Sequence, residues 1–174
     1  MAMTGKRIPA RLTARLARRI ELLVLDVDGT LTDGALWYGP RGEQLKRFHV
    51  RDGHGIKLVA AAGVTPAVIS GRRSAALAAR CRELGIRHLI VGAQDKCKAL
   101  DRLLRRLDLH ESQVAAIGDD TPDVPLFLRV ALAVAVSDAH PLAASAAHCR
   151  TTLPGGHGAV REVCDWLLAA RARA

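Results

Sequence analysis

Residues 22–34, with the sequence LLVLDVDGTLTDG, decide the fold of this chain. The apolar run from 22 to 25 predicts a buried β-strand, because it is too short for a helix and polar residues follow it at once. Asp26 and Asp28 come next, and side chains two residues apart on an extended chain point the same way. Open α/β sheets bind their ligands at the carboxyl ends of the strands, so both carboxylates are expected to face one site.

The rest of the chain alternates between strand and helix patterns joined by short connections. Strands are predicted at 64–69, 87–91, 114–117 and 132–136, and helices at 52–62, 73–84, 95–107, 125–129, 141–147 and 158–172. A β-hairpin is predicted between the first strand and the helix at 52–62. Its strands are expected at 36–38 and 45–50, around a turn at 39–42. The alternation predicts an α/β fold, a Rossmann-like parallel sheet with helices on both faces.

Two parts of the chain are distinguished by composition. Residues 21–174 are expected to form one domain, since 49% of the 174 residues are hydrophobic and no linker interrupts them. Residues 1–20 carry many cations and no acid before Glu21, a composition shared by basic helices and mitochondrial targeting segments. Leu12, Leu16 and Ile20 recur at helical spacing, which favours a basic N-terminal helical extension.

Charge and cysteine content narrow the class of protein. The net charge of +9 points to an anionic partner, either nucleic acid or a small anionic substrate that the charge steers into a cleft, although a solvated basic surface explains most of these charges equally well. Aromatic residues make up only 3% of the chain, and base stacking needs them, so nucleic acid is not the expected partner. The four cysteines form no CxxC pair, which favours reduced thiols and a cytoplasmic location. No apolar run approaches the ~18 residues of a membrane span.

Polar residues follow four of the predicted strands and together suit a single reaction. Besides the acidic pair, Ser70-Gly71-Arg72 ends the second parallel strand, Lys96 starts the helix after the third, and Gly118-Asp119-Asp120 ends the fourth. A cation such as Mg²⁺ prefers carboxylate oxygens, which Asp26 and Asp119 offer, and phosphate oxygens need donors, which Ser70 and Lys96 offer. Each element alone is commonly structural, but the set predicts phosphoryl transfer to an aspartate.

These motifs resemble the haloacid dehalogenase superfamily, and the resemblance extends over about residues 21–168. It is closer to the 3-deoxy-D-manno-octulosonate (KDO) 8-phosphate phosphatases, on the motifs at 26–34, 50–53, 70–72, 134–141 and 155–164. The resemblance implies that Asp26 attacks phosphorus and that Asp28 is the general acid and base. It implies that Ser70 and Lys96 stabilise the phosphoryl group, and that Mg²⁺ is held by Asp26, Asp119 and the carbonyl of Asp28.

The same resemblance implies a substrate and a set of residues that bind it. The expected reaction hydrolyses KDO 8-phosphate to KDO and inorganic phosphate, in the synthesis of lipopolysaccharide sugars. The implied substrate contacts are Asp28, His49, Val50, Arg51, Asp52, Gly53, Lys57, Arg72, Arg80 and Lys96. Arginine suits this task, because its guanidinium binds carboxylates in a bidentate manner.

The connections after the first two strands leave no room for a folded cap domain. A capless fold with the β-hairpin as a flap is therefore expected, and an open cleft lacks the water exclusion that a lid supplies. The resemblance implies a homotetramer in which neighbouring hairpins help to close each site. Trp37 and Tyr38 suit such an interface, although packing on their own domain explains them equally well.

Three other functions compete with this interpretation. The first is a phosphatase for a nine-carbon, sialic-acid-like keto-sugar phosphate. The second is a phospho-receiver or regulatory module, which also combines acidic residues, a hydroxyl and a lysine on a parallel sheet; such a module has no use for the acid at Asp28. The third is a nucleic-acid-binding protein, which only the charge favours and which steep salt dependence would reveal.

Overall fold

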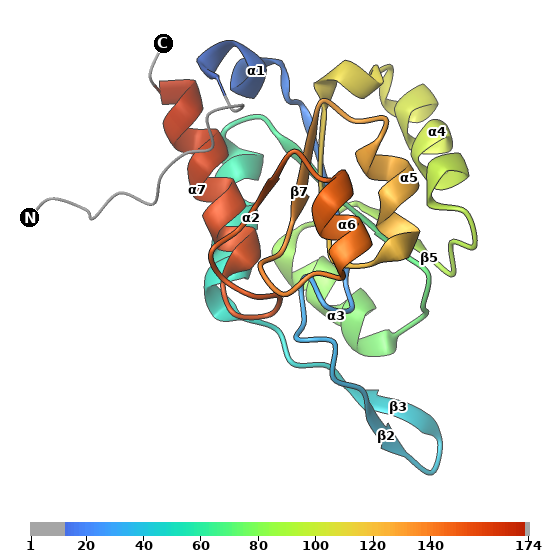
Figure 1. The fold of residues 1–174 in the computed structure, drawn as a ribbon. Coiled ribbons are helices and arrows are strands. Elements are labelled where there is room, and N and C mark those ends of the chain that lie inside the picture. Colours follow the sequence, from blue (N-terminus) through green and yellow to red (C-terminus); the bar gives the residue numbers. More distant parts are fainter. Residues whose placement is uncertain (1–12, 173–174) are drawn as a thin grey trace, which may run out of the picture.

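The computed structural model describes residues 13–172, and within that range six strands form one parallel sheet (Figure 1). Their order is β5-β4-β1-β6-β7-β8, with every neighbouring pair parallel. The strands are β1 (Leu22–Leu25), β4 (Thr65–Ser70), β5 (His88–Val91), β6 (Val114–Gly118), β7 (Leu132–Ala135) and β8 (Cys149–Arg150). The predicted Rossmann-like α/β fold is confirmed, with the 22–25 strand in its interior.

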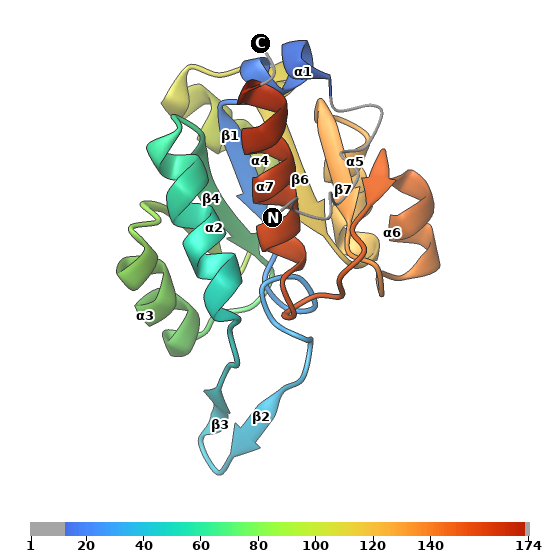
Figure 2. The ribbon, with the colours of Figure 1, turned by 90° about the vertical axis from the view of Figure 1, so that its left-hand side faces the viewer.

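Helices cover both faces of the sheet, so that β1 is buried on each side. The helices are α1 (Ala14–Arg19), α2 (Val50–Ala61), α3 (Ala75–Leu84), α4 (Lys96–Leu107), α5 (Val124–Phe127), α6 (Pro141–Ala146) and α7 (Ala159–Ala172), with 3-10 turns η1 (Glu111–Gln113) and η2 (Thr121–Asp123). Along β1, Leu23 and Leu25 join the core cluster under α2 and α7. Leu22 and Val24 join the cluster under α4 and α5 on the other face. Figure 2 shows α2 and α7 in front of the sheet.

The hairpin is a separate two-stranded sheet, β2 (Trp37–Gly39) and β3 (Gly42–Leu45), which extends away from the body (Figures 1 and 2). The predicted second strand at 45–50 was wrong: β3 ends at Leu45, and α2 already begins at Val50. The physical reason is a tighter turn, since Gly39 pairs with Gly42 and only Pro40 and Arg41 lie between them. The strand β8 was not predicted, because two residues are too short to show a period.

The connections after β1 and β4 contain only small elements. The segment from β1 to β4 holds the hairpin and α2, and the segment from β4 to α4 holds α3 and β5. Within the described range, no folded unit stands over the carboxyl ends of the strands, in keeping with a capless fold. The projecting hairpin is therefore the element that most resembles the predicted flap (Figure 1).

The predicted N-terminal extension falls partly outside the described residues, which begin at 13. Its described part, α1, packs on the domain: Ala17 and Ile20 are fully buried in the core. The guanidinium of Arg171 donates to the carbonyls of both residues, at 3.1 and 2.8 Å. From residue 13 to 172, no helix has both the length and the apolar character that crossing a bilayer demands.

Candidate active site

A cleft of about 780 Å³ lies at the carboxyl ends of β1, β4 and β6, next to the start of α4. Parallel pairing aligns these strands, because Leu25 lies beside both Val68 and Ile117. The residues that follow each strand are therefore brought to one edge, as expected for an open α/β sheet. Its lining includes Asp26, Asp28, Ser70, Arg72, Lys96, Asp119, Asp120 and Asp123. All four catalytic residues of the prediction and the predicted metal ligands thus share one cleft.

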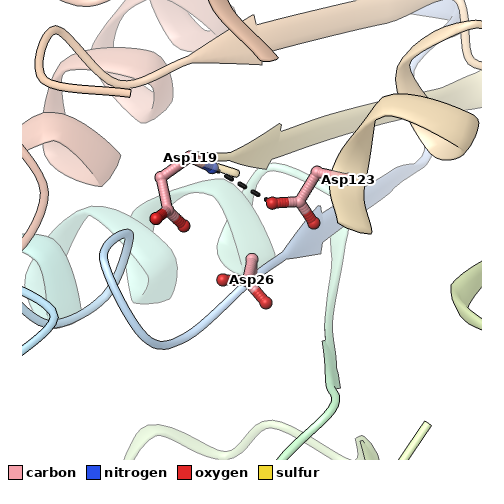
Figure 3. Close-up of side chains that lie close together, drawn as sticks. All are labelled: Asp26, Asp119 and Asp123. Atoms are coloured by element: carbon pink, nitrogen blue, oxygen red, sulfur yellow. Dashed lines mark hydrogen bonds between the residues drawn. The ribbon is translucent and has the colours of Figure 1, made fainter. Parts of the chain in front are cut away.

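Three carboxylates meet on the floor of this cleft. Asp26, Asp119 and Asp123 each offer an oxygen that lies within 4.8 Å of the other two. Figure 3 shows Asp26 after β1, Asp119 after β6 and Asp123 at the turn that follows. Gly29 makes this approach possible, since a Cβ there would overlap the Asp119 carboxylate and its φ of +90° also favours glycine.

Lys96 is the cation of this cluster. Its Nζ donates to Asp26 Oδ1 at 2.6 Å and to Asp123 Oδ1 at 2.5 Å. Burial lowers the pKa of Lys96, but the two carboxylates outweigh that effect and raise it above its usual value. The ammonium therefore stays charged, and Lys96 lines the cleft beside Asp26 and Asp123.

Asp123 is not among the site residues predicted from the sequence, but the structure places it in the cleft. Its Oδ2 accepts the backbone N–H groups of Asp119 and Asp120, at 3.1 and 3.3 Å. Its Oδ1 accepts from Lys96, so both oxygens are occupied by donors. The spacing Asp119-Asp120-x-x-Asp123 was the available signal, but helix capping explains the same pattern.

The remaining two carboxylates hold protons more tightly than usual. Burial and the nearby Asp123 raise the pKa of Asp26 to about 6. Burial and the nearby Asp26 raise the pKa of Asp119 to about 8, although the Thr30 hydroxyl donates to its Oδ1 at 3.1 Å. Three carboxylates share a single lysine here, so a divalent cation would relieve their repulsion.

Asp28 lies in the same cleft, but its partners come from the hairpin side. The ammonium of Lys46 forms an ion pair with Asp28 Oδ1 and lies 3.2 Å from Glu43 Oε2. Arg72 donates to Glu43 Oε2 at 3.0 Å and to the Tyr38 hydroxyl at 3.1 Å. Burial raises the pKa of Glu43, but hydrogen bonds from Ser74, Arg72 and Lys46 outweigh it and lower that pKa. Sequence reasoning missed Lys46 and Glu43, because only the path of the chain in three dimensions brings Lys46 to Asp28 and Glu43 to Arg72.

The predicted substrate residues on α2 and α3 do not line this cleft. His49, Asp52, Gly53 and Arg80 surround a small cavity of about 10 Å³, and Val50, Lys57 and Arg80 border other hollows nearby. Arg51 lies on the first turn of α2 and is exposed.

Several of these residues already have partners within the described chain. Arg80 pairs with Glu83 at 2.8 Å, and its guanidinium lies 6.0 Å from the centre of the Phe48 ring. Asp52 Oδ1 accepts the backbone N–H of Arg161 at 2.7 Å, at the start of α7. Of the predicted substrate contacts, only Asp28, Arg72 and Lys96 therefore reach the acidic cleft within one chain.

The fold and the acidic cleft define a haloacid dehalogenase-like hydrolase, and the model of that family matches residues 88–162. The KDO 8-phosphate phosphatase of Yersinia pestis is 48% identical over 155 residues, which cover 89% of this chain and 83% of that protein. The chain belongs to the family of 3-deoxy-D-manno-octulosonate 8-phosphate phosphatases.

Solved structures of this family share the fold in detail. The phosphatase of Moraxella catarrhalis, in complex with magnesium, phosphate and KDO, is 38% identical with a TM-score of 0.88, covering 92% of each chain. The cobalt-bound phosphatase of Haemophilus influenzae is 39% identical with a TM-score of 0.88, covering 90% of this chain and 92% of that one.

Proposed function

We propose that this chain is a Mg²⁺-dependent phosphatase that hydrolyses KDO 8-phosphate to KDO and inorganic phosphate. The observation that carries the proposal is the convergence of Asp26, Asp28, Ser70, Lys96 and Asp119 on one cleft. Family membership supports the sugar phosphate, and a phosphoric monoester hydrolase is the enzyme class that the family defines.

The carboxylate cluster fits a magnesium ion. Mg²⁺ prefers hard oxygen ligands and usually keeps several waters, so one or two carboxylates suffice. Both carboxylate oxygens of Asp123 already accept hydrogen bonds, from Lys96 and from two backbone N–H groups. Asp26, Asp119 and the backbone carbonyl of Asp28 would therefore hold the ion. When bound, the ion neutralises charge on the carboxylates and on the phosphoryl oxygens.

The first chemical step belongs to Asp26 and Asp28. A carboxylate oxygen of Asp26 bonds to phosphorus as the bond from phosphorus to the sugar oxygen breaks. The carboxyl group of Asp28 gives its proton to the departing sugar oxygen. Lys96 stabilises the charge that develops on the phosphoryl group. The Ser70 Oγ accepts the backbone N–H of Arg72 at 3.2 Å, so its own hydroxyl proton is free to be donated to a phosphoryl oxygen.

The second step releases phosphate and restores the enzyme. Asp28, now a carboxylate, takes a proton from a water molecule whose oxygen bonds to phosphorus. The bond between phosphorus and Asp26 breaks, so that inorganic phosphate leaves and both aspartates return to their starting states.

Assembly completes the proposed site. Trp37, Tyr38 and Leu45 on the hairpin are 56%, 64% and 63% exposed, which suits contact with another copy. In a homotetramer of this kind, the predicted substrate contacts at 49–53, Lys57 and Arg80 would reach the substrate in the cleft of a neighbouring subunit. The proposal places the enzyme in the cytoplasm and assigns it neither nucleic acid nor membrane as a partner; the scattered cysteines of the sequence support the location.

Steady-state hydrolysis of a panel of esters tests the proposal. With Mg²⁺ present, we expect kcat/KM for KDO 8-phosphate to exceed that for nine-carbon keto-sugar phosphates by about 10-fold or more. Removing the metal with a chelator should abolish turnover. Faster hydrolysis of a nine-carbon ester would reassign the substrate, and a stable phosphorylated chain that releases no phosphate would indicate a receiver module instead.

A further inference from the structure

Lys46 is a buried cation that the proposed reaction does not yet use. Its side chain is only 1% exposed, although it lies one residue beyond the end of the projecting strand β3. The ammonium pairs with Asp28 Oδ1 and also lies 3.2 Å from Glu43 Oε2. A lysine that is withdrawn from water in this way keeps one fixed position, because Asp28 and Glu43 hold it from two sides.

The two oxygens of Asp28 therefore have different surroundings. Oδ1 is the oxygen that pairs with Lys46, whereas Oδ2 lies 3.7 Å from the Arg72 Nε, which is beyond hydrogen-bond distance. Among the described residues, that Nε is itself a buried donor without a hydrogen-bond partner. Oδ2 and an unsatisfied donor thus face each other in the cleft that both residues line.

Arg72 is fixed by the same part of the hairpin. Its Nη2 donates to Tyr38 and Glu43, so the guanidinium is held while the Nε stays unpaired. A substrate oxygen that accepts from this Nε would lie beside Asp28 Oδ2. A buried donor without a partner is costly, so a ligand atom that satisfies it is favoured there.

We propose that Lys46 is a positioning residue that anchors Asp28 Oδ1 and so presents Oδ2 to the leaving oxygen of the substrate. The proposal rests on the function given above, in which Asp28 transfers the proton. Lys46 touches no reacting atom; it determines which oxygen of Asp28 faces the cleft. General acid catalysis requires the donor to stand within hydrogen-bond reach of its target, so a freely rotating carboxyl group would lose much of its effect.

The leaving group of the substrate provides the test. A sugar alkoxide needs a proton to depart, whereas p-nitrophenolate leaves without one. Asp28 is also the base of the second step, which the two esters share, so the first step is measured alone, in single turnover. With Lys46→Met, we expect the single-turnover release of KDO from KDO 8-phosphate to slow about 100-fold, and that of p-nitrophenol from p-nitrophenyl phosphate by less than about 5-fold. Lys46→Arg keeps a cation and should recover most of the lost activity on the sugar phosphate.

A matched control and a double variant guard against a merely structural effect. Arg41→Met removes an exposed cation from the turn of the same hairpin and should leave both activities within about 2-fold of the wild type. The double variant Asp28→Asn, Lys46→Met should be no slower on the sugar phosphate than Asp28→Asn alone, because the two residues act through one proton transfer.

Equal losses of the single-turnover rate on the two esters, or no loss on either, would overturn the role of Lys46. Should Lys46→Met fail to fold, as judged by circular dichroism, the ratio of the two activities in Lys46→Arg and Lys46→Gln decides the matter in the same way. A wild-type chain that hydrolyses neither ester would instead refute the proposed function, so the two failures are distinguishable.

Discussion

The floor of the cleft and its hairpin side differ in how they are built. The floor takes Asp26 and Asp119 from the ends of buried strands and Lys96 from the start of α4, and this one lysine lies among three carboxylates. The hairpin side takes Lys46 and Glu43 from the segment that leaves the body, next to exposed apolar residues, and Arg72 from the turn after β4. Under the proposed function, one chain would hold the phosphoryl group by itself, whereas the proposed assembly would complete the recognition of the sugar.

The largest expected effect tests the floor. Asp26→Asn removes the nucleophile, so phosphate release from KDO 8-phosphate should fall by at least about 10⁴-fold. The fold should persist, because Lys96 keeps Asp123 as a partner and the change relieves repulsion with Asp119. Thermal unfolding should shift by less than about 5 °C. A variant that remained active would refute the role of Asp26.

The next prediction separates the two roles of Asp28, proton transfer by its carboxyl group and metal binding by its backbone carbonyl. Asp28→Asn should lower kcat for the sugar phosphate by about 10²- to 10⁴-fold, since the amide has no proton to transfer. Magnesium affinity, measured by calorimetry, should change little, because the proposed ligand is the backbone carbonyl. Loss of metal binding in this variant would show that the carboxylate is the ligand.

Acidity offers a further test of the floor. The pKa of Asp119 is raised to about 8 and that of Asp26 to about 6, so Asp119 binds a proton as the pH falls below 8 and Asp26 does so only near pH 6. Magnesium must displace these protons, and its apparent Kd should rise about tenfold for each unit between pH 8 and pH 6. Calorimetry in two buffers of different ionisation enthalpy would detect the released proton. A Kd that does not change over this range would contradict the assignment of the ligands.

The smallest effect concerns the hairpin side. Trp37→Lys together with Leu45→Lys should dissociate the proposed tetramer, as measured by light scattering after size exclusion, and should lower kcat/KM by about 10-fold. Tyr38 is left intact because it contacts Arg72. Leu128→Lys is the control, since Leu128 is equally apolar and exposed but follows α5. A wild-type chain that is monomeric in solution would remove the basis for this prediction.

The sequence alone determined the parallel sheet and the residues at its carboxyl edge. Burial of an apolar strand on both faces, and polar residues directly after it, are local patterns that need no knowledge of the rest of the chain. Asp26, Ser70, Lys96 and Asp119 could be placed together for this reason, because neighbouring parallel strands end at one edge.

Only the tertiary structure decided what surrounds those residues. The ion pair of Lys46 with Asp28, the dual role of Asp123, and the separation of Arg80 from the cleft all depend on how segments fold back on one another. No periodicity encodes such contacts, since they join residues far apart in the chain through side-chain geometry. Local patterns of burial determine which segments form the strands of the sheet. The position of the hairpin relative to the sheet determines which charged side chains surround Asp28.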